Sequence, residues 1–352
     1  MLASNTIAKN IEKWLQVAWY MPTPLSFVFQ IILWPLSQVY RLLAFSHKAL
    51  YKIGVFKTHK VSVPVVVVGN IVTGGGGKTP TVIALMQHLQ AQNIKVGVIS
   101  RGYGRISTAC LEVNPDSALS DVGDEPVVLL LACSAPIFVA ESRFEAASTL
   151  LKTYPNTQVI ISDDGLQQHA MQHDIAITVF DDRGIGNGML LPAGPLREST
   201  VKSHNSLVLH TGNKAVKLAN TAAPQFTARR AIASYSLRSD GGKVHFDGLK
   251  TAAKPLLALA GIANPEAFFA MLRHAGLNLA ETLALSDHYN FDSVLGNKYA
   301  DYSQKYTVLC TVKDAVKLWQ IDPGVLAVPL DFSPEPAFFA AFDAMLKPLL
   351  KS

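Results

Sequence analysis

A run of four valines, Val65 to Val68, precedes a run of four glycines, Gly74 to Gly77, which leads directly into Lys78 and Thr79. The valines predict a buried β-strand, and residues 81–90 predict a helix. Glycines let backbone N–H groups turn toward phosphate oxygens, a lysine neutralises phosphate charge, and a threonine hydroxyl at a helix N-terminus suits Mg²⁺. This order of strand, loop and helix predicts a loop that binds the phosphates of a nucleoside triphosphate.

The loop is a variant of the usual phosphate-binding pattern. In the spacing G-x-x-x-x-G-K-[ST], the first glycine would stand where this chain has Val72. The alternative is a flexible glycine-rich turn. Such a turn needs neither a strand before it nor a lysine and a threonine at the start of a helix after it. We therefore expect a P-loop NTPase-like α/β fold.

Length and composition are compatible with two α/β domains. The chain has 352 residues, and 49% of them are hydrophobic. The net charge of +5 favours acidic partners such as phosphates or anionic lipid. No basic stripe with interleaved aromatic residues is present, so nucleic acid is not expected as a partner, and no obligate protein partner is inferred. Three widely spaced cysteines argue against a disulfide framework or a zinc site and favour a reducing cytosol.

Residues 25–45 differ from the rest of the chain by their apolar character. Trp34 and Tyr40 are aromatic residues typical of membrane interfaces, and several lysines follow. Pro35 is expected to break the helix, so we predict a pair of membrane-associated helices that lies on or shallowly enters an anionic bilayer. The alternative is an ordinary helix packed on the core. A cleavable signal peptide is not expected, because no small-residue cleavage site follows.

Apolar runs recur downstream at the spacing of strand–helix–strand units, which predicts a parallel sheet. Expected strands are 95–100, 136–140, 159–161, 175–180, 207–210, 255–260 and 306–311, and expected helices are 125–133, 142–152, 265–274 and 314–319. A turn at Asp240-Gly241-Gly242 predicts a β-ribbon. We expect an N-terminal membrane-associated helical segment (1–62), a P-loop core (63–221), a β-ribbon linker (222–250) and a second, smaller α/β domain (251–352).

Two pairs of acidic residues lie at the ends of predicted elements. Asp163 and Asp164 end a predicted strand, and in a parallel sheet this end lies beside the phosphate loop, where an acid can hold Mg²⁺ directly or through water. An Asp-Asp-Gly turn without a ligand is the alternative. Asp124 and Glu125 lie at the start of a predicted helix, which Asp124 could simply cap.

A loop rich in glycine and proline follows the predicted strand at 175–180. Arg183 and Arg197 in this loop favour phosphate binding, because a planar guanidinium makes bidentate contacts, while Glu198 could orient Arg197 or approach a metal. In the second half of the chain, His288 lies outside any periodic run. A lone histidine is usually structural, and only a nearby carboxylate would make it a base-orienting group.

Eight motifs follow one another along the chain. They are VVVVGNIVTGGGGKTP (65–80), ISRGYGR (99–105), GDEP (123–126), DDGLQ (163–167), RGIGNGMLLPAGPLRE (183–198), GIANP (261–265), DHYNF (287–291) and TVKDAVK (311–317). In this order they resemble the tetraacyldisaccharide 4'-kinase family, the lipid A kinases of Gram-negative bacteria. The resemblance implies transfer of the ATP γ-phosphate, with Mg²⁺, to the 4'-hydroxyl of a tetraacylated glucosamine disaccharide 1-phosphate to give lipid IVA. It also implies a location at the cytoplasmic face of the bacterial inner membrane.

The resemblance further implies roles for individual residues. Thr73, Gly74, Gly75, Gly76, Gly77, Lys78 and Thr79 would bind ATP, Asn70, Tyr103, Arg183 and Arg197 would bind the substrate, and Thr79, Glu125, Asp163, Asp164 and Glu198 would lie around the metal. Asp124 would accept the hydroxyl proton, paired with His288 from the second domain. Lys78 would also act in catalysis.

Three positions depart from the family pattern. Gly76 stands where a hydroxyl residue is common, Gln168 stands where histidine is common, and Val312 replaces a common glutamate. The last change argues against a metal site near residue 312. Lys78 and Thr79 are retained, so the departures leave the nucleotide-binding expectation in place.

Two other functions share some of these features. A membrane-bound positioning or partitioning ATPase has a similar loop and a membrane helix, but its signature lysine before the glycines is replaced by Thr73 here. Such a protein would also leave Asp287 and His288 without a task. A nucleotide-binding scaffold without turnover is the third class. ATP consumption that depends on added lipid disaccharide would separate all three.

Overall fold

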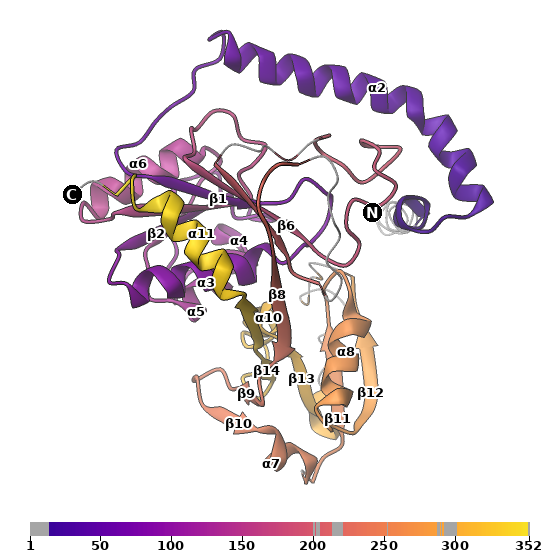
Figure 1. Ribbon diagram of the computed structural model, residues 1–352. Helices are drawn as coiled ribbons and strands as arrows, with labels where there is room; N and C mark the ends of the chain where they lie inside the picture. Colours follow the sequence, from indigo (N-terminus) through magenta and orange to yellow (C-terminus); the bar gives the residue numbers. More distant parts are fainter. Residues whose placement is uncertain are drawn as a thin grey trace.

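The computed structural model describes residues 14–199, 201, 205–212, 221–251, 253–286, 289, 291 and 301–350. They form two sheets covered by helices, together with a long N-terminal helix that stands apart from both sheets (Figure 1). The predicted α/β class, with a parallel sheet and a second, smaller α/β unit, is confirmed.

The larger sheet has nine strands in the order β15-β8-β7-β6-β1-β5-β2-β4-β3. In chain order they are β1 (Val65–Gly69), β2 (Val96–Ser100), β3 (Leu111–Glu112), β4 (Ile137–Val139), β5 (Val159–Asp163), β6 (Ile175–Phe180), β7 (Ser206–His210), β8 (Gln225–Ile232) and β15 (Leu330–Pro334). All pairs from β8 to β4 are parallel, and the two edge pairs are antiparallel. The glycine run therefore follows a central strand, β1, between β5 and β6.

Helices cover both faces of this sheet. Successive strand residues point to opposite faces, and the central strands are apolar on both, so each face needs a covering layer. Val66 and Val68 face a core that also contains side chains of α3 (Lys78–Ala91), α5 (Asp124–Ala132) and α11 (Pro336–Leu346). Val65 and Val67 face a second core, which α6 (Arg143–Thr153) helps to fill. A short helix, α4 (Leu119–Val122), directly precedes α5.

The smaller sheet has six strands in the order β10-β9-β14-β13-β11-β12. They are β9 (Tyr235–Leu237), β10 (Lys243–His245), β11 (Leu256–Ala260), β12 (Leu279–Ala284), β13 (Thr307–Thr311) and β14 (Leu326–Val328). The helices α7 (Phe246–Lys250) and α8 (Pro265–His274) cover one face, and α10 (Val312–Leu318) covers the other. Helix α10 also reaches α5 of the larger unit.

The connection between the two sheets differs from a single ribbon. Strand β8 joins the larger sheet, whereas β9 and β10 form a hairpin at the edge of the smaller one. After β14 the chain returns as β15, which covers the free edge of β8, and as α11, which buries Phe338 and Phe342 in the larger core. The domain boundaries stay predictions. Within the predicted C-terminal range, β15 and α11 pack with the larger sheet, because the apolar side chains of α11 are buried in its core.

Helix α2 (Pro24–Lys52) runs through Pro35 without a break, which corrects the prediction that this proline would divide it. Proline lacks one N–H group and so removes one hydrogen bond of the helical ladder. The remaining bonds carry the helix on, and it bends along its length (Figure 1). The break between two helices lies instead at residues 21–23, where a helix over 14–20 ends before α2 begins.

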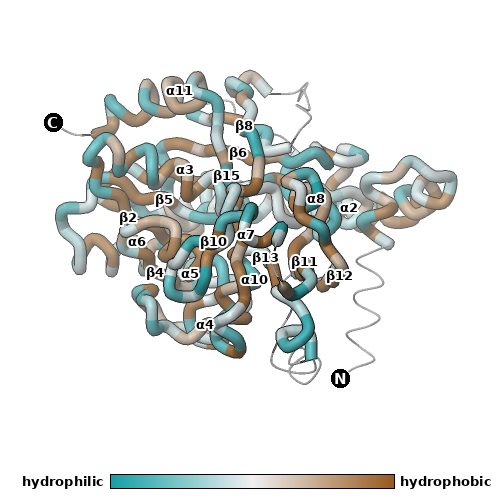
Figure 2. Tube along the Cα trace, turned by 90° about the horizontal axis from the view of Figure 1, so that it is seen from below, coloured by the Kyte–Doolittle hydropathy of each residue, from teal (hydrophilic) through white to brown (hydrophobic). Residues whose placement is uncertain are grey.

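The buried and exposed sides of α2 are reversed relative to a core helix. The structure describes α2 in full, and its buried residues are Ser26 and Ser37. Its large apolar side chains point outward, with an exposed fraction that reaches 69% at Phe45. The alternative of an ordinary helix packed on the core is therefore not what the structure has. By length and composition α2 could cross a membrane, and it projects beyond the rest of the molecule (Figure 2).

The position of α11 leads to a prediction about stability. Phe342→Ala should lower the free energy of unfolding by ~3–5 kcal/mol, because it removes a fully buried ring from the larger core. Urea denaturation followed by circular dichroism measures this change. Ile321→Ala is the control, since Ile321 is 45% exposed, and should cost under ~0.5 kcal/mol. Equal, small effects would mean that α11 contributes little to the core.

Candidate active site

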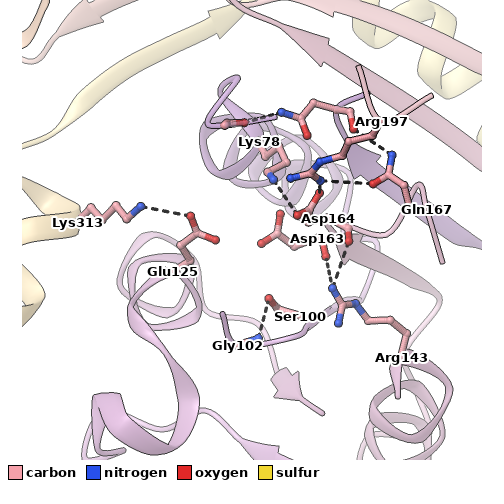
Figure 3. A network of polar contacts seen from close by, with 12 residues as sticks. Lys78, Ser100, Gly102, Glu125, Arg143, Asp163, Asp164, Gln167, Arg197 and Lys313 are labelled. Atoms are coloured by element: carbon pink, nitrogen blue, oxygen red, sulfur yellow. Dashed lines mark hydrogen bonds and ion pairs between the residues drawn. The ribbon is translucent and has the colours of Figure 1, made fainter. Parts of the chain in front are cut away.

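The centre of the site lies where β1 and β5 end side by side. Val68 pairs with Asp163 in a parallel register, so the loop after β1 and the acidic turn after β5 leave the sheet at the same edge. Lys78 Nζ lies 2.9 Å from Asp164 Oδ2. Figure 3 shows Lys78, Asp163 and Asp164 together at the centre of a wider polar network. The structure thus brings the glycine loop and the first acidic pair together.

Three side chains hold the carbonyl groups of the glycine loop. Asn70 Nδ2 donates to Gly74 O at 2.6 Å, and Thr211 Oγ1 donates to Gly76 O at 2.8 Å. Arg183 Nη2 donates to Gly75 O, while its guanidinium also forms an ion pair with Asp181. Asn70 and Arg183 were expected as substrate contacts, but here both brace the loop. Thr211, which no sequence motif pointed to, lies just beyond β7.

This bracing leaves the loop N–H groups on the opposite side. Within the described part of the chain, the backbone N–H groups of Gly75, Gly76 and Gly77 donate no hydrogen bond. Neighbouring N–H groups without protein partners form a concave anion-binding surface, especially at the N-terminus of a helix such as α3. The loop can therefore receive phosphate oxygens.

Individual glycines differ in what they require. Gly77 has a φ of +87°, and a Cβ there would lie 2.7 Å from Thr211 Oγ1, so only glycine fits. At Gly76 the nearest atoms to such a Cβ are 3.5 Å away, which is ordinary contact. A side chain would therefore have room at position 76, and the glycine there is not required by space.

The two carboxylates after β5 have opposite electrostatic surroundings. Asp163 is 1% exposed, and burial together with the charge of Glu125 raises its pKa to about 7. Burial also opposes ionisation of Asp164, but the charges of Lys78 and Arg197 outweigh it and lower the pKa of this carboxyl. Among the described residues, Oδ1 of each aspartate accepts no hydrogen bond. One carboxylate is paired with protein cations, and the other is buried with an unused oxygen.

Arg143, at the first position of α6, supports the turn that carries these two aspartates. Its Nη2 donates to the backbone carbonyl oxygens of Asp163 and Asp164, at 3.0 and 3.2 Å (Figure 3). The side chain is 3% exposed, and burial lowers its pKa to about 10, although the nearby carboxylates act in the opposite direction. The sequence reading missed this residue. Its position at the start of a predicted helix after a predicted strand was the available signal.

Arg197 and Glu198 meet the site through Gln167, which was also missed. Arg197 Nη1 lies 3.6 Å from Asp164 Oδ1 and 3.5 Å from Gln167 Oε1. Gln167 Nε2 donates to Glu198 Oε1 at 3.0 Å and to the carbonyl oxygen of Asn70 at 3.1 Å. The glycine- and proline-rich loop is therefore joined to both the phosphate loop and the acidic turn.

The second acidic pair faces this network from α5. Asp124 is the first residue of the helix rather than its N-cap, which is Gly123. Its carboxylate lies 2.8 Å from Lys317 Nζ, while Glu125 Oε1 lies 3.5 Å from Lys313 Nζ. Both lysines belong to α10 of the smaller unit, and Figure 3 shows Lys313 reaching across to Glu125.

Four expected site residues remain. Tyr103 is 65% exposed, on a loop whose backbone lies against Gly123. Thr73 has a buried hydroxyl with no hydrogen-bond partner in the described part of the structure, and its N–H donates to the carbonyl oxygen of Pro195. Thr79 lies in the first turn of α3. His288 and its neighbour Asp287 lie outside the described residues.

The donor set suits an ion shared with phosphate rather than one enclosed by protein. The described residues include no group of three or more His, Cys, Asp or Glu that could hold a metal alone. Mg²⁺ in nucleotide sites is usually held by one or two carboxylates, with substrate phosphates and water as the other ligands. The free, buried oxygen of Asp163, beside a loop that can bind phosphate, fits this arrangement.

Comparisons with known proteins agree with the motifs. The family model described as "LpxK: Tetraacyldisaccharide-1-P 4'-kinase" matches residues 29–347. The tetraacyldisaccharide 4'-kinase of Polaromonas naphthalenivorans (strain CJ2) is 50% identical over 326 residues, which cover 91% of this chain and 92% of the relative. The enzyme of the same name from Polaromonas sp. (strain JS666 / ATCC BAA-500) is 51% identical over 327 residues, covering 91% and 93%.

A solved structure has the same fold. The crystal structure of the "apo" form of LpxK from Aquifex aeolicus in complex with ATP superposes with a TM-score of 0.77 at 26% identity, covering 92% of this chain and 99% of that one. Sequence relatives and fold therefore agree over nearly the whole length. The chain belongs to the tetraacyldisaccharide-1-P 4'-kinase family.

Proposed function

We propose that this protein transfers the γ-phosphoryl group of ATP to the 4'-hydroxyl of tetraacyldisaccharide 1-phosphate. The observation that carries the proposal is the glycine loop with Lys78, held beside Asp163 and Asp164 in a chain of this family. Phosphoryl transfer needs positioning and charge stabilisation, with one group to accept the hydroxyl proton. The transfer of ³²P from ATP to the lipid disaccharide tests the proposal directly.

ATP binding is proposed for the loop from Thr73 to Thr79. The N–H groups of Gly75 to Gly77 are available to phosphate oxygens, and Lys78 supplies a positive charge at the start of α3. In the structure, Lys78 Nζ is paired with Asp164 Oδ2 at 2.9 Å. A phosphate group would therefore compete with this carboxylate for the lysine.

Five residues are proposed as candidate ligands of a magnesium ion. They are Thr79, Asp163 and Asp164, with Glu125 and Glu198 as further acids near the site. When bound, Mg²⁺ would neutralise charge on the phosphate oxygens. In the protein alone, Asp163 is a buried carboxylate that costs stability when it is ionised. Functional sites commonly lower the stability of the folded protein in this way.

The proposed base is Asp124, with His288 as its partner from the second unit. Asp124 lies at the N-terminus of α5, and the smaller unit contacts it through Lys317. Arg197 is placed to contact the phosphates or the acidic substrate, since its guanidinium approaches Asp164 at the centre of the site. The roles of Asn70, Tyr103 and Arg183 in substrate binding stay predictions.

We also propose that the protein works at the cytoplasmic face of the inner membrane. The apolar side chains of α2 point away from the protein, as binding to a bilayer requires. Ser37 Oγ donates to Leu190 O at 2.9 Å, and Tyr40 Oη donates to Arg197 O at 3.1 Å. Helix α2 is thus attached to the loop that carries Arg197, and a substrate with acyl chains in the membrane would meet the site nearby.

Lys78→Ala should lower kcat by at least ~100-fold while the protein stays folded. A contact with developing phosphate charge is worth ~3 kcal/mol or more, and the lysine side chain is not part of either core. The ³²P-transfer assay and thermal melting measure the two parts of the prediction. Lys95→Ala is the matched control, because Lys95 is an exposed lysine just before β2, at the edge of the sheet opposite the site. A folded, fully active Lys78→Ala protein would contradict the assignment.

Asp163→Asn should stabilise the protein free of metal and nucleotide, and more so at pH 8 than at pH 5. The pKa of Asp163 in the folded protein, about 7, lies above the ordinary value of 3.8. The protonated carboxyl therefore contributes stability that is fully present below pH 3.8 and is lost as the pH rises through about 7. Asparagine lacks the charge that burial penalises. We expect a rise in Tm of a few degrees at pH 8.

Thermal melting in a chelating buffer checks this prediction. Asp116→Asn removes an exposed carboxylate and serves as the control. A Tm difference between Asp163→Asn and the unmodified protein that stays constant from pH 5 to pH 8 would contradict the raised pKa of Asp163.

The membrane proposal predicts that polar substitutions on α2 release the protein from liposomes. Ile32 and Leu43 are 63% and 64% exposed, so Ile32→Glu combined with Leu43→Glu should abolish flotation with anionic vesicles. Unlike deletion of residues 1–48, which should also release the protein, this pair keeps Ser37 and Tyr40 in place. Ile321→Glu is the control. Flotation that persists in the double variant would place the membrane contact elsewhere.

A further inference from the structure

Lys317 of α10 lies between the two units, next to the proposed base. Its Nζ is 2.8 Å from Asp124 Oδ2, and the two side chains are only 16% and 5% exposed. The same Nζ donates, at 3.4 Å, to the backbone carbonyl oxygen of Tyr289. Tyr289 directly follows His288 in the sequence. One ammonium group therefore joins the N-terminus of α5 to the segment that carries the proposed partner of Asp124.

The carboxylate of Asp124 is held at both oxygens. Oδ1 accepts a hydrogen bond from the backbone N–H of Glu125 at 2.9 Å, and Oδ2 is paired with Lys317. Ion pairs on an exposed surface fix little, but a buried carboxylate needs its cation, because an uncompensated buried charge is costly. Lys317 therefore sets both the charge balance and the orientation of this carboxylate.

Helix α10 is itself fixed to the loop that follows β11. Asp314, one turn before Lys317, is fully buried, and its Oδ2 accepts hydrogen bonds from Gly261 N at 3.0 Å and Thr311 Oγ1 at 2.7 Å. A Cβ on Gly261 would lie 2.8 Å from Asp314 Oδ1 and 3.2 Å from Ser286 O. This close packing leaves room only for glycine.

Three sequence motifs of the smaller unit therefore meet at one point. Gly261 begins GIANP, Tyr289 lies in DHYNF, and Asp314 and Lys317 lie in TVKDAVK. Together they form a rigid group that presents Lys317 to Asp124. One turn earlier on α10, Lys313 makes a parallel but longer pair with Glu125.

We propose that Lys317 is a positioning residue for phosphoryl transfer, which holds the carboxylate of Asp124 and the backbone carbonyl of Tyr289 in one arrangement across the two units. This inference rests on the proposed function, in which Asp124 accepts the proton of the sugar hydroxyl. In this role Lys317 acts through its ion pair with Asp124. The alternative is a purely structural role, in which Lys317 only holds the two units together.

The test compares turnover of single and double variants of the full-length protein, with ³²P-labelled ATP and the lipid disaccharide. Lys317→Met should lower kcat by ~10-fold or more and leave the KM for ATP within ~2-fold, because the nucleotide loop is untouched. Lys317→Arg, which keeps the charge, should recover most of the lost rate. Lys250→Met is the matched control, since it removes the exposed lysine of a pair with Asp247 in the same unit and should not alter kcat.

The decisive comparison is made in the Asp124→Ala background. If Lys317 acts through Asp124, adding Lys317→Met to Asp124→Ala should cause no further loss of kcat. A loss as large as in the unmodified protein would show a structural role and overturn the inference, as would a Lys317→Met protein with normal kcat. If Lys317→Met fails to fold, Lys317→Gln and Lys317→Arg replace it in the same cycle.

The two proposals fail in different ways. Phosphate transfer by the unmodified protein, with no effect of Lys317→Met, overturns only the inference about Lys317. Failure of the unmodified protein to phosphorylate the disaccharide overturns the proposed function, and the inference with it. Full activity of Asp124→Ala overturns the assignment of the base and, with it, the role given to Lys317.

Discussion

The parallel register between β1 and β5 is the constraint on which the site depends. Val68 lies opposite Asp163, so the glycine loop and the acidic turn leave adjacent strands at the same level. A slip of one residue would turn Asp163 toward the other face of the sheet and move Lys78 away from Asp164. Val65 to Val68 are all buried, with Val66 and Val68 in one core and Val65 and Val67 in the other, so β1 is packed between helices on both faces. Hydrophobic packing on the two faces thus sets a polar geometry at the end of the strands.

The charges at this edge balance one another without satisfying every atom. Asp164 faces Lys78 and Arg197, and Arg143 holds the two backbone carbonyls beneath the turn. Asp163 carries the unfavourable part of this arrangement, since it is buried and Oδ1 has no partner among the described residues. Removing one partner from such a network usually costs more than the pair itself contributes, because the other charge stays buried. A group that brings both positive charge and phosphate oxygens could relieve this imbalance.

Sequence reasoning recovers what local patterns encode and misses what depends on distant contacts. The helix expected at 265–274 begins at Pro265 and ends at His274, because proline and a preceding Asn264 cap mark its start. The glycine loop and the acidic turn were visible as motifs. The return of α11 to the larger sheet was not, since an apolar helix does not reveal which core it fills. Thr211 braces the glycine loop from the segment after β7, which no motif marks, and the contact of Gln167 with Glu198 joins two motifs across 31 residues. Pro35 was overvalued as a helix breaker, because one missing hydrogen bond does not end a helix of 29 residues.

Helix α2 connects the apolar and the catalytic sides of the molecule. A core helix buries its apolar face, but α2 buries Ser26 and Ser37 and exposes its phenylalanines and most of its leucines. Ser37 is needed inside because Oγ donates to Leu190 O and accepts from the N–H of Ala193, which satisfies two backbone groups of the glycine- and proline-rich loop. A leucine at position 37 would leave the N–H of Ala193 without this acceptor, while Leu190 O would keep its hydrogen bond from Gly194 N. The same loop carries Arg197 to the acidic turn, so the polar contacts of an apolar helix help to hold a cation beside the phosphate loop. The reversed pattern of α2 therefore follows from two demands: one side is left for an apolar environment, and the other is hydrogen-bonded to the site.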